Sequence, residues 1–349
     1  GLLIGVIGYN SAAPLLTMLG TPGEAYQLAL DYLRVVFIAM PVIMVTVIVT
    51  MAMRGAGDAR TPLIFMLVAV VLDVGLNPLF IAGIGPFPEL GIVGSGVAML
   101  IANVVSLTGL LTYIYVKDLP LRLRGAELTY LRPRGEELRY IVAKGFPMGA
   151  QMLIMSAAGI IMIGLVNQEG LLMAAAYGAS LQLFTYVQMP AMAIGGAVSS
   201  MAAQYIGARK WDVLNQVSRA GVLINIVITG TMALITVVFD IPLLSMFLGG
   251  ESEALPLAAH IMLIASWNFV FFGVTMVYSG TMRAAGAVWM PLLIVVVALY
   301  PARLGFYYLT YEWLGSDAIW WSFSVGGVVA TILALLLYYF TNWRGHAQA

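Results

Sequence analysis

One acidic residue lies inside a long uncharged apolar run: Asp73, with Asn77 four residues later and Pro78 directly after it. Four residues make about one turn of helix, so the carboxylate and the amide would share a face. Proline lacks an N–H and leaves a backbone carbonyl one turn earlier without its usual donor. Such oxygens suit a hard cation, and a carboxylate also carries a proton. We therefore expect Asp73 and Asn77 to form a cation- or proton-coupling site. The alternative is an aspartate that only hydrogen-bonds between helices.

Other kinds of chemistry have little support in the composition. The chain has no cysteine and only two histidines, His260 and His346, which excludes disulfides, thiolate metal sites and a cysteine nucleophile. No phosphate-binding glycine loop is present. The formal net charge is zero, so nothing indicates a nucleic-acid partner. We expect no catalytic residue, no metal site and no cofactor other than a coupling ion, either a proton or sodium.

The composition is that of a membrane protein. Hydrophobic residues make up 62% of the chain and charged residues 9%, whereas a soluble domain carries about 25% charged residues. A backbone surrounded by lipid must satisfy its own hydrogen bonds, so the expected class is an all-α integral membrane protein. Apolar runs long enough to cross a bilayer lie near 1–19, 25–52, 62–83, 90–116, 139–166, 171–203, 213–239, 254–281, 290–311 and 318–341.

Basic and acidic residues separate between alternate loops. All lysines and arginines except Arg34 and Arg303 lie at one set of helix ends, while the opposite loops carry acids such as Glu89 and Glu169. The positive-inside rule places the basic set in the cytoplasm. We therefore expect a multi-pass protein of the cytoplasmic membrane whose C-terminus is cytoplasmic.

A motif occurs twice at cytoplasmic helix ends. MRGAGDARTPLI at 53–64 returns as MRAAGAVWMPLL at 282–293. In each copy an arginine ends a helix, a glycine permits a tight turn, and a proline begins the next helix. Thr61 is an N-cap candidate in the first copy only. The structural turn residues are Arg54, Gly57 and Pro62 in the first copy and Arg283, Gly286 and Pro291 in the second.

The spacing of the two copies indicates a duplicated architecture. An offset of 229 residues holds six helix-and-loop units, an even number, so both copies have the same orientation. We expect two six-helix bundles related by a pseudo-twofold axis along the membrane normal. About ten of twelve helices would then be present, with about 94 residues of the first half preceding Gly1. The predicted parts are the rest of the N-terminal lobe (end of the third to the sixth helix) at 1–116, a cytoplasmic linker at 117–138 and the C-terminal lobe (seventh to twelfth helix) at 139–349.

Over essentially its whole length the sequence resembles the multidrug and toxic compound extrusion (MATE) transporters. The resemblance rests on the two turn motifs and on LNPLFIAG, GIVGSGVAMLIAN, GFPMGAQ and MPAMAIGGAVSSMAAQYIGARKWD. It implies a secondary antiporter in which two six-helix lobes form a V and drug exit is coupled to entry of protons or sodium ions. Family members often show Asn, three residues, then Asp-Pro, where this chain has Asp73, three residues, then Asn77-Pro78. The family's common Thr in the sixth helix is Met99 here.

The two halves differ in their polar residues. The positions matching Asp73 and Asn77 in the second half are Ala302 and Phe306, so we expect ion coupling in the first half. Arg303 is expected to snorkel or to pair with an acid. Cavity-lining candidates in the second half, for which the alternative is hydrogen bonding between helices, are Gln151, Tyr177, Gln182, Tyr186 and Gln188.

The leading functional prediction is a multidrug efflux antiporter that exports amphipathic or cationic organic compounds in exchange for protons or sodium ions. Its partners would be small organic substrates and the lipid bilayer, and it would act as a monomer. A lipid-linked saccharide flippase of related fold is the first alternative, but it should show a cationic central cavity. A membrane-embedded enzyme would need a nucleophile with its base, or a metal site. A channel fits two unlike lobes less well than alternating access does.

Overall fold

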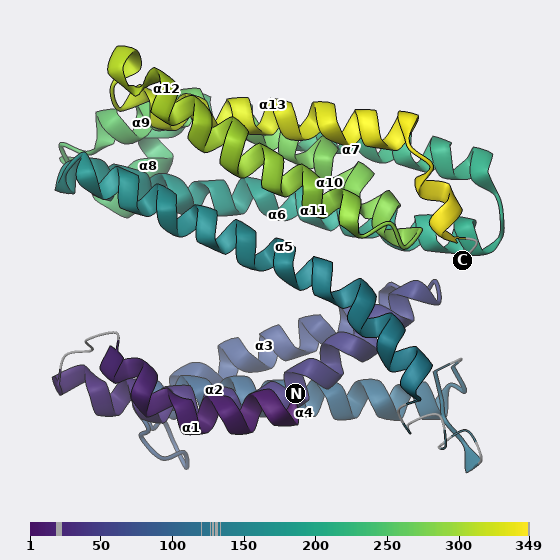
Figure 1. Ribbon diagram of the computed structural model, residues 1–349. Coiled ribbons are helices and arrows are strands. Elements are labelled where there is room, and N and C mark those ends of the chain that lie inside the picture. The colour runs from purple at the N-terminus through teal and green to yellow at the C-terminus, as the bar shows by residue number, and fades with distance from the viewer. Residues whose placement is uncertain are drawn as a thin grey trace. The chain divides into compact units, whose positions relative to one another are not determined.

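A computed structural model describes residues 1–18, 23–119, 121–125, 127, 129, 132 and 134–347. Within these residues the secondary structure is entirely helical (Figure 1). The chain divides into two compact units, Gly1–Arg132 and Pro133–Ala349, here called unit 1 and unit 2. The division falls inside the predicted linker 117–138.

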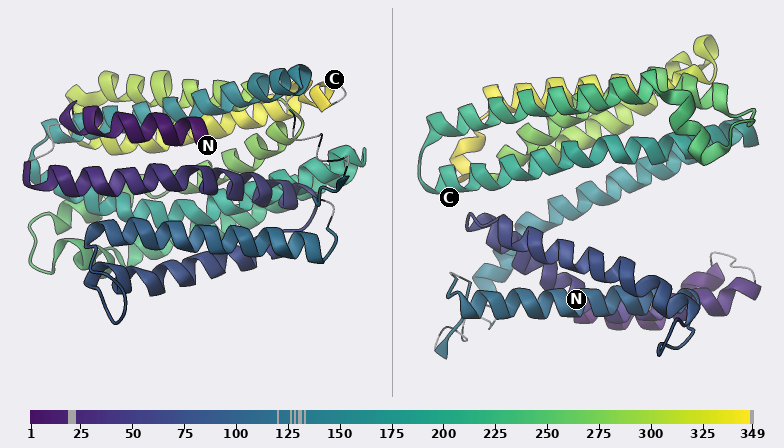
Figure 2. Two further views of the ribbon diagram at one scale, coloured as in Figure 1. Left: turned by 90° about the horizontal axis from the view of Figure 1, so that it is seen from below. Right: turned by 180° about the vertical axis from the view of Figure 1, so that it is seen from behind.

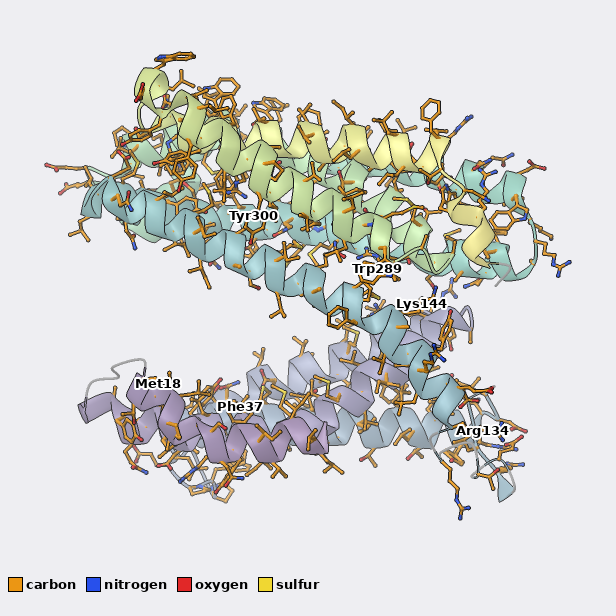
Figure 3. The ribbon with its side chains drawn as sticks, in the orientation of Figure 1. Met18, Phe37, Arg134, Lys144, Trp289 and Tyr300 are labelled. Carbon is orange, nitrogen blue, oxygen red and sulfur yellow. The ribbon has the colours of Figure 1, made fainter. Side chains whose placement is uncertain are left out.

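In its described part, unit 1 contains four α-helices: α1 (Leu2–Met18), α2 (Gly23–Gly55), α3 (Arg60–Ala82) and α4 (Ile92–Val116). Both α2 and α3 pack against α4, and α1 packs against α2. The α1–α2 contact is close because Gly8 faces Phe37 (Figure 3). A Cβ atom at Gly8 would lie 2.1 Å from the Phe37 ring.

Unit 2 contains the remaining helices, and α10 lies at the centre of its packing. Its neighbours are α6, α7 and α13, while α6 and α7 run side by side in the views of Figure 2. In chain order the elements are α5 (Gly135–Gln168), α6 (Leu171–Gly207), α7 (Trp211–Val238), α8 (Asp240–Leu248), α9 (Leu255–Ala265), α10 (Asn268–Ala284), α11 (Trp289–Val297), the π-helix η2 (Ala298–Leu304), α12 (Gly305–Leu314), α13 (Asp317–Phe340) and the 3₁₀ helix η3 (Trp343–Ala347).

A buried amide links three helices in the core of unit 2. Asn225 on α7 is fully buried, and its Nδ2 donates to the carbonyl of Ala191 on α6 at 3.2 Å and of Gly273 on α10 at 3.1 Å. Glycine at position 273 leaves room for this amide, because a Cβ atom would lie 2.1 Å from Asn225 Oδ1 and would force the side chain to move. A polar side chain therefore fixes how α6, α7 and α10 pack.

The helices identify a multi-pass membrane protein. Among the described residues, seven helices are long and apolar enough to cross a membrane, and the bent pair α9–α10 brings the number to eight. The 17-residue α1 is apolar but shorter, and α6 has 37 residues but carries polar side chains such as Gln182 and Gln188 along its length. Each of the ten predicted apolar runs coincides with one helix or one helical series.

The chain departs from those predicted runs in four places. The short helix α8 occupies part of a predicted loop, α9 and α10 are bent by 43° at their junction, and α11 passes into the π-helix η2. Pro301 lies inside η2, and a proline disrupts the regular helical hydrogen bonds by removing an N–H and crowding the preceding turn. Helix α5 also begins at Gly135, earlier than the predicted 139.

The first copy of the repeated motif forms a glycine-terminated helix end. Gly57 has φ 96°, its N–H donates to Arg54 O at 3.1 Å, and Asp58 N–H donates to Met53 O at 3.0 Å. This pair of bonds is the Schellman arrangement, which satisfies the last carbonyls of a helix and favours glycine at the left-handed position.

The second copy has the same backbone structure. Gly286 has φ 82°, and its N–H donates to Arg283 O at 2.9 Å; Ala287 N–H donates to Met282 O at 3.0 Å. Two turns 229 residues apart therefore match bond for bond. Lys144 on α5 adds a contact at this copy, since its Nζ donates to Gly286 O at 2.7 Å (Figure 3).

The N-cap prediction for Thr61 is wrong. Helix α3 begins at Arg60, so Thr61 lies in its first turn. The capping side chain is Asp58, whose Oδ1 accepts from Arg60 N at 3.1 Å and Thr61 N at 3.0 Å. Pro62 lies in the same first turn, where its missing N–H costs nothing, and Pro291 has the equivalent place in α11.

Candidate functional site

A cavity of about 400 Å³ lies between α2, α3 and α4, and we call it the unit-1 cavity. Most of its wall is apolar, including the side chains of Met51, Met66 and Met99. The polar residues that line it are Thr46, Thr50, Arg54, Asp73, Asn103 and Ser106.

The Asp73 carboxylate lines this cavity with one oxygen that has no hydrogen-bond partner. The residue is half-buried, and Oδ1 is buried. Three nearby polar groups donate to backbone carbonyls instead: Thr46 to residue 42, Asn103 to residue 99, and Ser106 to residue 65, at 2.8, 2.8 and 2.6 Å. An oxygen in this setting can accept a proton or a cation.

Asn77 lies outside the lining of the unit-1 cavity. Its Nδ2 donates to the backbone carbonyl of Asp73 at 3.0 Å, one turn back on α3. The amide therefore contacts the Asp73 backbone and not its carboxylate. Direct participation of Asn77 in ion binding stays a prediction. Within the residues described, no three His, Cys, Asp or Glu side chains come together as metal ligands would.

A second cavity, of about 280 Å³, lies within unit 2 between α5, α6, α10, α11, η2 and α13, and we call it the unit-2 cavity. It brings together two of the five side chains predicted to line a cavity, Tyr177 and Gln188. Gln182 and Tyr186 are exposed on α6, and Gln151 is buried on α5 without lining this cavity.

Arg303 is the charged residue of the unit-2 cavity. It comes from η2, and its guanidinium carbon lies 3.4 Å from the centre of the Phe323 ring. The side chain also interacts with Tyr177. Among the described residues it forms no ion pair with an acid, so the predicted pairing is wrong for this part of the chain, and snorkelling stays a prediction. In the sequence, Arg303 could have been identified as a cavity residue because it is a single charged residue near Pro301 in an apolar run.

Sequence reasoning missed the polar residues of α2 and α4 that line the unit-1 cavity together with Asp73. Thr46 and Thr50 lie one turn apart on α2, and Asn103 lies on α4. Their spacing marks polar faces on two apolar helices, which could have indicated them as cavity residues. Their convergence on Asp73 depends on how three helices pack, and the sequence alone does not reveal that packing.

The fold and these two cavities define a polytopic α-helical membrane protein with spaces of small-molecule size. The chain belongs to the MatE family, whose model matches residues 1–79 and 147–309. Over 341 residues it is 35% identical to "Probable multidrug resistance protein YoeA" of Bacillus subtilis, covering 97% of this chain and 73% of that protein. It is 29% identical to "Probable multidrug resistance protein YpnP" of the same organism, with 97% and 74% coverage.

Solved structures agree on the fold. A crystal structure of MATE in complex with MaL6 matches all of this chain and 77% of its own with a TM-score of 0.88, at 22% sequence identity. The predicted MATE resemblance is thereby confirmed, and the protein is a multi-pass membrane transporter of the multidrug efflux family. Because members of this family are transporters, the enzyme alternative is excluded.

Proposed function

We propose that the protein exports amphipathic, often cationic, organic compounds in exchange for protons or sodium ions, with Asp73 as the coupling residue. The observation that carries this proposal is the buried, unpartnered Oδ1 of Asp73 in the unit-1 cavity. A cavity of about 400 Å³ is the size of a small-molecule site, since such sites span roughly 300–1,000 Å³.

The lining of the unit-1 cavity supports an amphipathic substrate. Met51, Met66 and Met99 present flexible, polarizable side chains that adapt to ligands of varied shape. Asp73 supplies the negative charge that a cationic group would meet. Arg54 lines the same cavity from the last turn of α2, and its Nη2 lies 3.3 Å from the Met66 sulfur.

Antiport follows if the coupling ion and the substrate compete for Asp73. An ionised carboxylate in an apolar cavity is costly, and a bound proton, a sodium ion or a cationic substrate each offsets that cost. The occupant that neutralises Asp73 changes the packing of α2, α3 and α4 and thereby favours one orientation of the transporter. Substrate and ion with opposite preferences are then exchanged, and each weakens binding of the other by the same factor.

Asn77 and Pro78 support a conformational role for this part of α3. The amide of Asn77 holds the Asp73 carbonyl, and Pro78 supplies no N–H to the carbonyl of residue 74. A helix with a locally weakened hydrogen-bond ladder bends more easily. We propose that this segment adjusts when Asp73 changes charge.

The setting we propose is the cytoplasmic membrane, with a monomer as the working unit and the C-terminus in the cytoplasm. The basic residues at one set of helix ends support that orientation. A lipid-linked saccharide flippase remains the alternative: Asp73 in the unit-1 cavity would repel an anionic phosphate, whereas Arg54 in the same lining would attract one.

Transport in reconstituted vesicles tests the proposal. Proton and sodium gradients are imposed separately while export of a fluorescent cationic dye is followed. We expect Asp73→Asn to reduce gradient-driven export at least about tenfold, and Asp73→Glu to retain part of it. The exposed Asp212 on α7 gives a matched control, Asp212→Asn, that keeps wild-type export. Undiminished export by a folded Asp73→Asn protein would reject the assignment.

A further inference from the structure

The unit-2 cavity contains a cation without a matching anion. Among the described residues, no carboxylate lines this cavity, and the buried Nε of Arg303 has no hydrogen-bond partner. The ion pairs among the described residues, Arg122–Asp118 and His260–Asp317, do not involve it. A buried guanidinium without a counter-ion is energetically unfavourable, so a site of this kind favours an anionic ligand.

The surroundings hold Arg303 in position. Its guanidinium stacks over Phe323 and interacts with Tyr177, itself only 5% exposed. Gly326 on α13 leaves space for it, because a Cβ atom there would lie 3.1 Å from Ala298 O and 3.3 Å from Arg303 Cβ. The residue belongs to the π-helix η2, and such irregular turns frequently occur at functional sites.

Aromatic rings form one part of the remaining wall, which is otherwise mostly aliphatic. The rings of Phe184 and Phe269 lie 5.1 Å apart, and those of Phe184 and Phe323 lie 6.4 Å apart. All three line the cavity, together with the polar side chains of Gln188 and Asn268. An aromatic wall beside one cation complements a ligand that has an apolar ring and a single negative charge.

We propose that the unit-2 cavity binds small amphipathic organic anions, with a carboxylate on Arg303 and Tyr177 and an aromatic ring among Phe184, Phe269 and Phe323. This anion site is separate from the unit-1 cavity, for which we propose cation binding. It does not depend on ion coupling at Asp73. A volume of about 280 Å³ suits a ligand of one or two rings.

A matched pair of probes tests the proposal. We would measure equilibrium binding of 1-naphthylacetate and 1-naphthylmethylammonium, which share a ring and differ in charge, to the full chain in lipid nanodiscs without any gradient. The wild type should bind the anion about tenfold or more tightly than the cation, as a charge-assisted contact predicts. Arg303→Met should abolish that preference, and Arg303→Lys should retain part of it. Arg219→Met, at an exposed arginine of α7, should behave as the wild type.

A second measurement does not depend on a variant that folds. On the wild-type protein, 1-naphthylacetate should raise the Tm more than 1-naphthylmethylammonium does at equal concentration. Equal affinity and equal thermal shift for the two probes would overturn the proposal, and so would unchanged anion binding by folded Arg303→Met. Because no gradient is present, failure of coupling at Asp73 would leave these results intact, and the two proposals fail separately.

Discussion

Lys144 on α5 donates a hydrogen bond from Nζ to the backbone carbonyl of Gly286, 2.7 Å away, in the turn between α10 and α11. A cation at this point meets carbonyls at the C-terminal end of α10, the negative end of the helix dipole. The contact joins two residues that are 142 positions apart in the chain.

Removing this contact should weaken unit 2. Lys144→Met keeps the length of the side chain and loses the charged donor, so we expect a loss of about 1.5–3 kcal/mol in the free energy of unfolding. Chemical unfolding in detergent measures it. The matched control is Lys210→Met at an exposed lysine, which should change stability little. Equal effects of the two substitutions would show that the contact to Gly286 contributes nothing specific.

Each of the two turn glycines should be required for the full stability of the fold. Gly57→Ala and Gly286→Ala place a Cβ atom at φ 96° and 82°, and we expect each to cost about 1–2 kcal/mol of stability.

A neighbouring glycine provides the control for that pair. Gly55 shows no positive φ, and a Cβ atom there would meet nothing within 4 Å. The second copy of the motif already has Ala284 at the matching position. Gly55→Ala should therefore be neutral or slightly stabilising. If it destabilises as much as Gly57→Ala, the left-handed turn is not the reason for the conserved backbone structure of the two copies.

The cap on α3 should give a pH-dependent contribution to stability. Hydrogen bonds from the side chain and backbone of Thr61, and from the backbone of Arg60, lower the pKa of Asp58 below its ordinary value of 3.8. A lowered carboxyl pKa stabilises the fold above that ordinary value, and the stabilisation is lost as pH falls through the lowered pKa. Asp58→Ala should cost about 1 kcal/mol at neutral pH.

Stability curves for wild type, Asp58→Ala and Asp58→Asn over acid to neutral pH check this. Asparagine also caps helices, so Asp58→Asn should retain most of the stability at neutral pH without the acid-dependent part. The difference in the free energy of unfolding between wild type and Asp58→Ala should disappear at low pH. A gap that stays constant with pH would mean that the charge on Asp58 makes no contribution.

The architecture could be predicted well from the sequence because a lipid bilayer imposes simple rules on the length and type of the segments that cross it. Apolar length predicted the helical runs, and the repeat predicted the matching turns at Gly57 and Gly286. The bend between α9 and α10 and the π-helix at Pro301 were not predicted, because proline and packing alter hydrogen bonding only locally.

The candidate sites could be predicted only in part. Asp73 was identifiable because a charge in an apolar run is costly and therefore informative. The polar residues of α2 and α4 beside it required knowledge of how the helices pack. For the same reason Tyr177 and Gln188 share a cavity while Gln182 and Tyr186, on the same helix, are exposed. The face of α6 on which each residue lies decides this difference, and a list of polar residues does not give that face.

Substrate affinity measured against pH and sodium concentration tests the central proposal most directly. If ion and substrate compete through Asp73, affinity of the wild type for a cationic dye should fall when protons or sodium ions, whichever couples, become abundant. In Asp73→Asn the affinity should be independent of both. A folded Asp73→Asn protein whose dye affinity keeps the wild-type dependence on pH and sodium would contradict the assignment of coupling to this carboxylate.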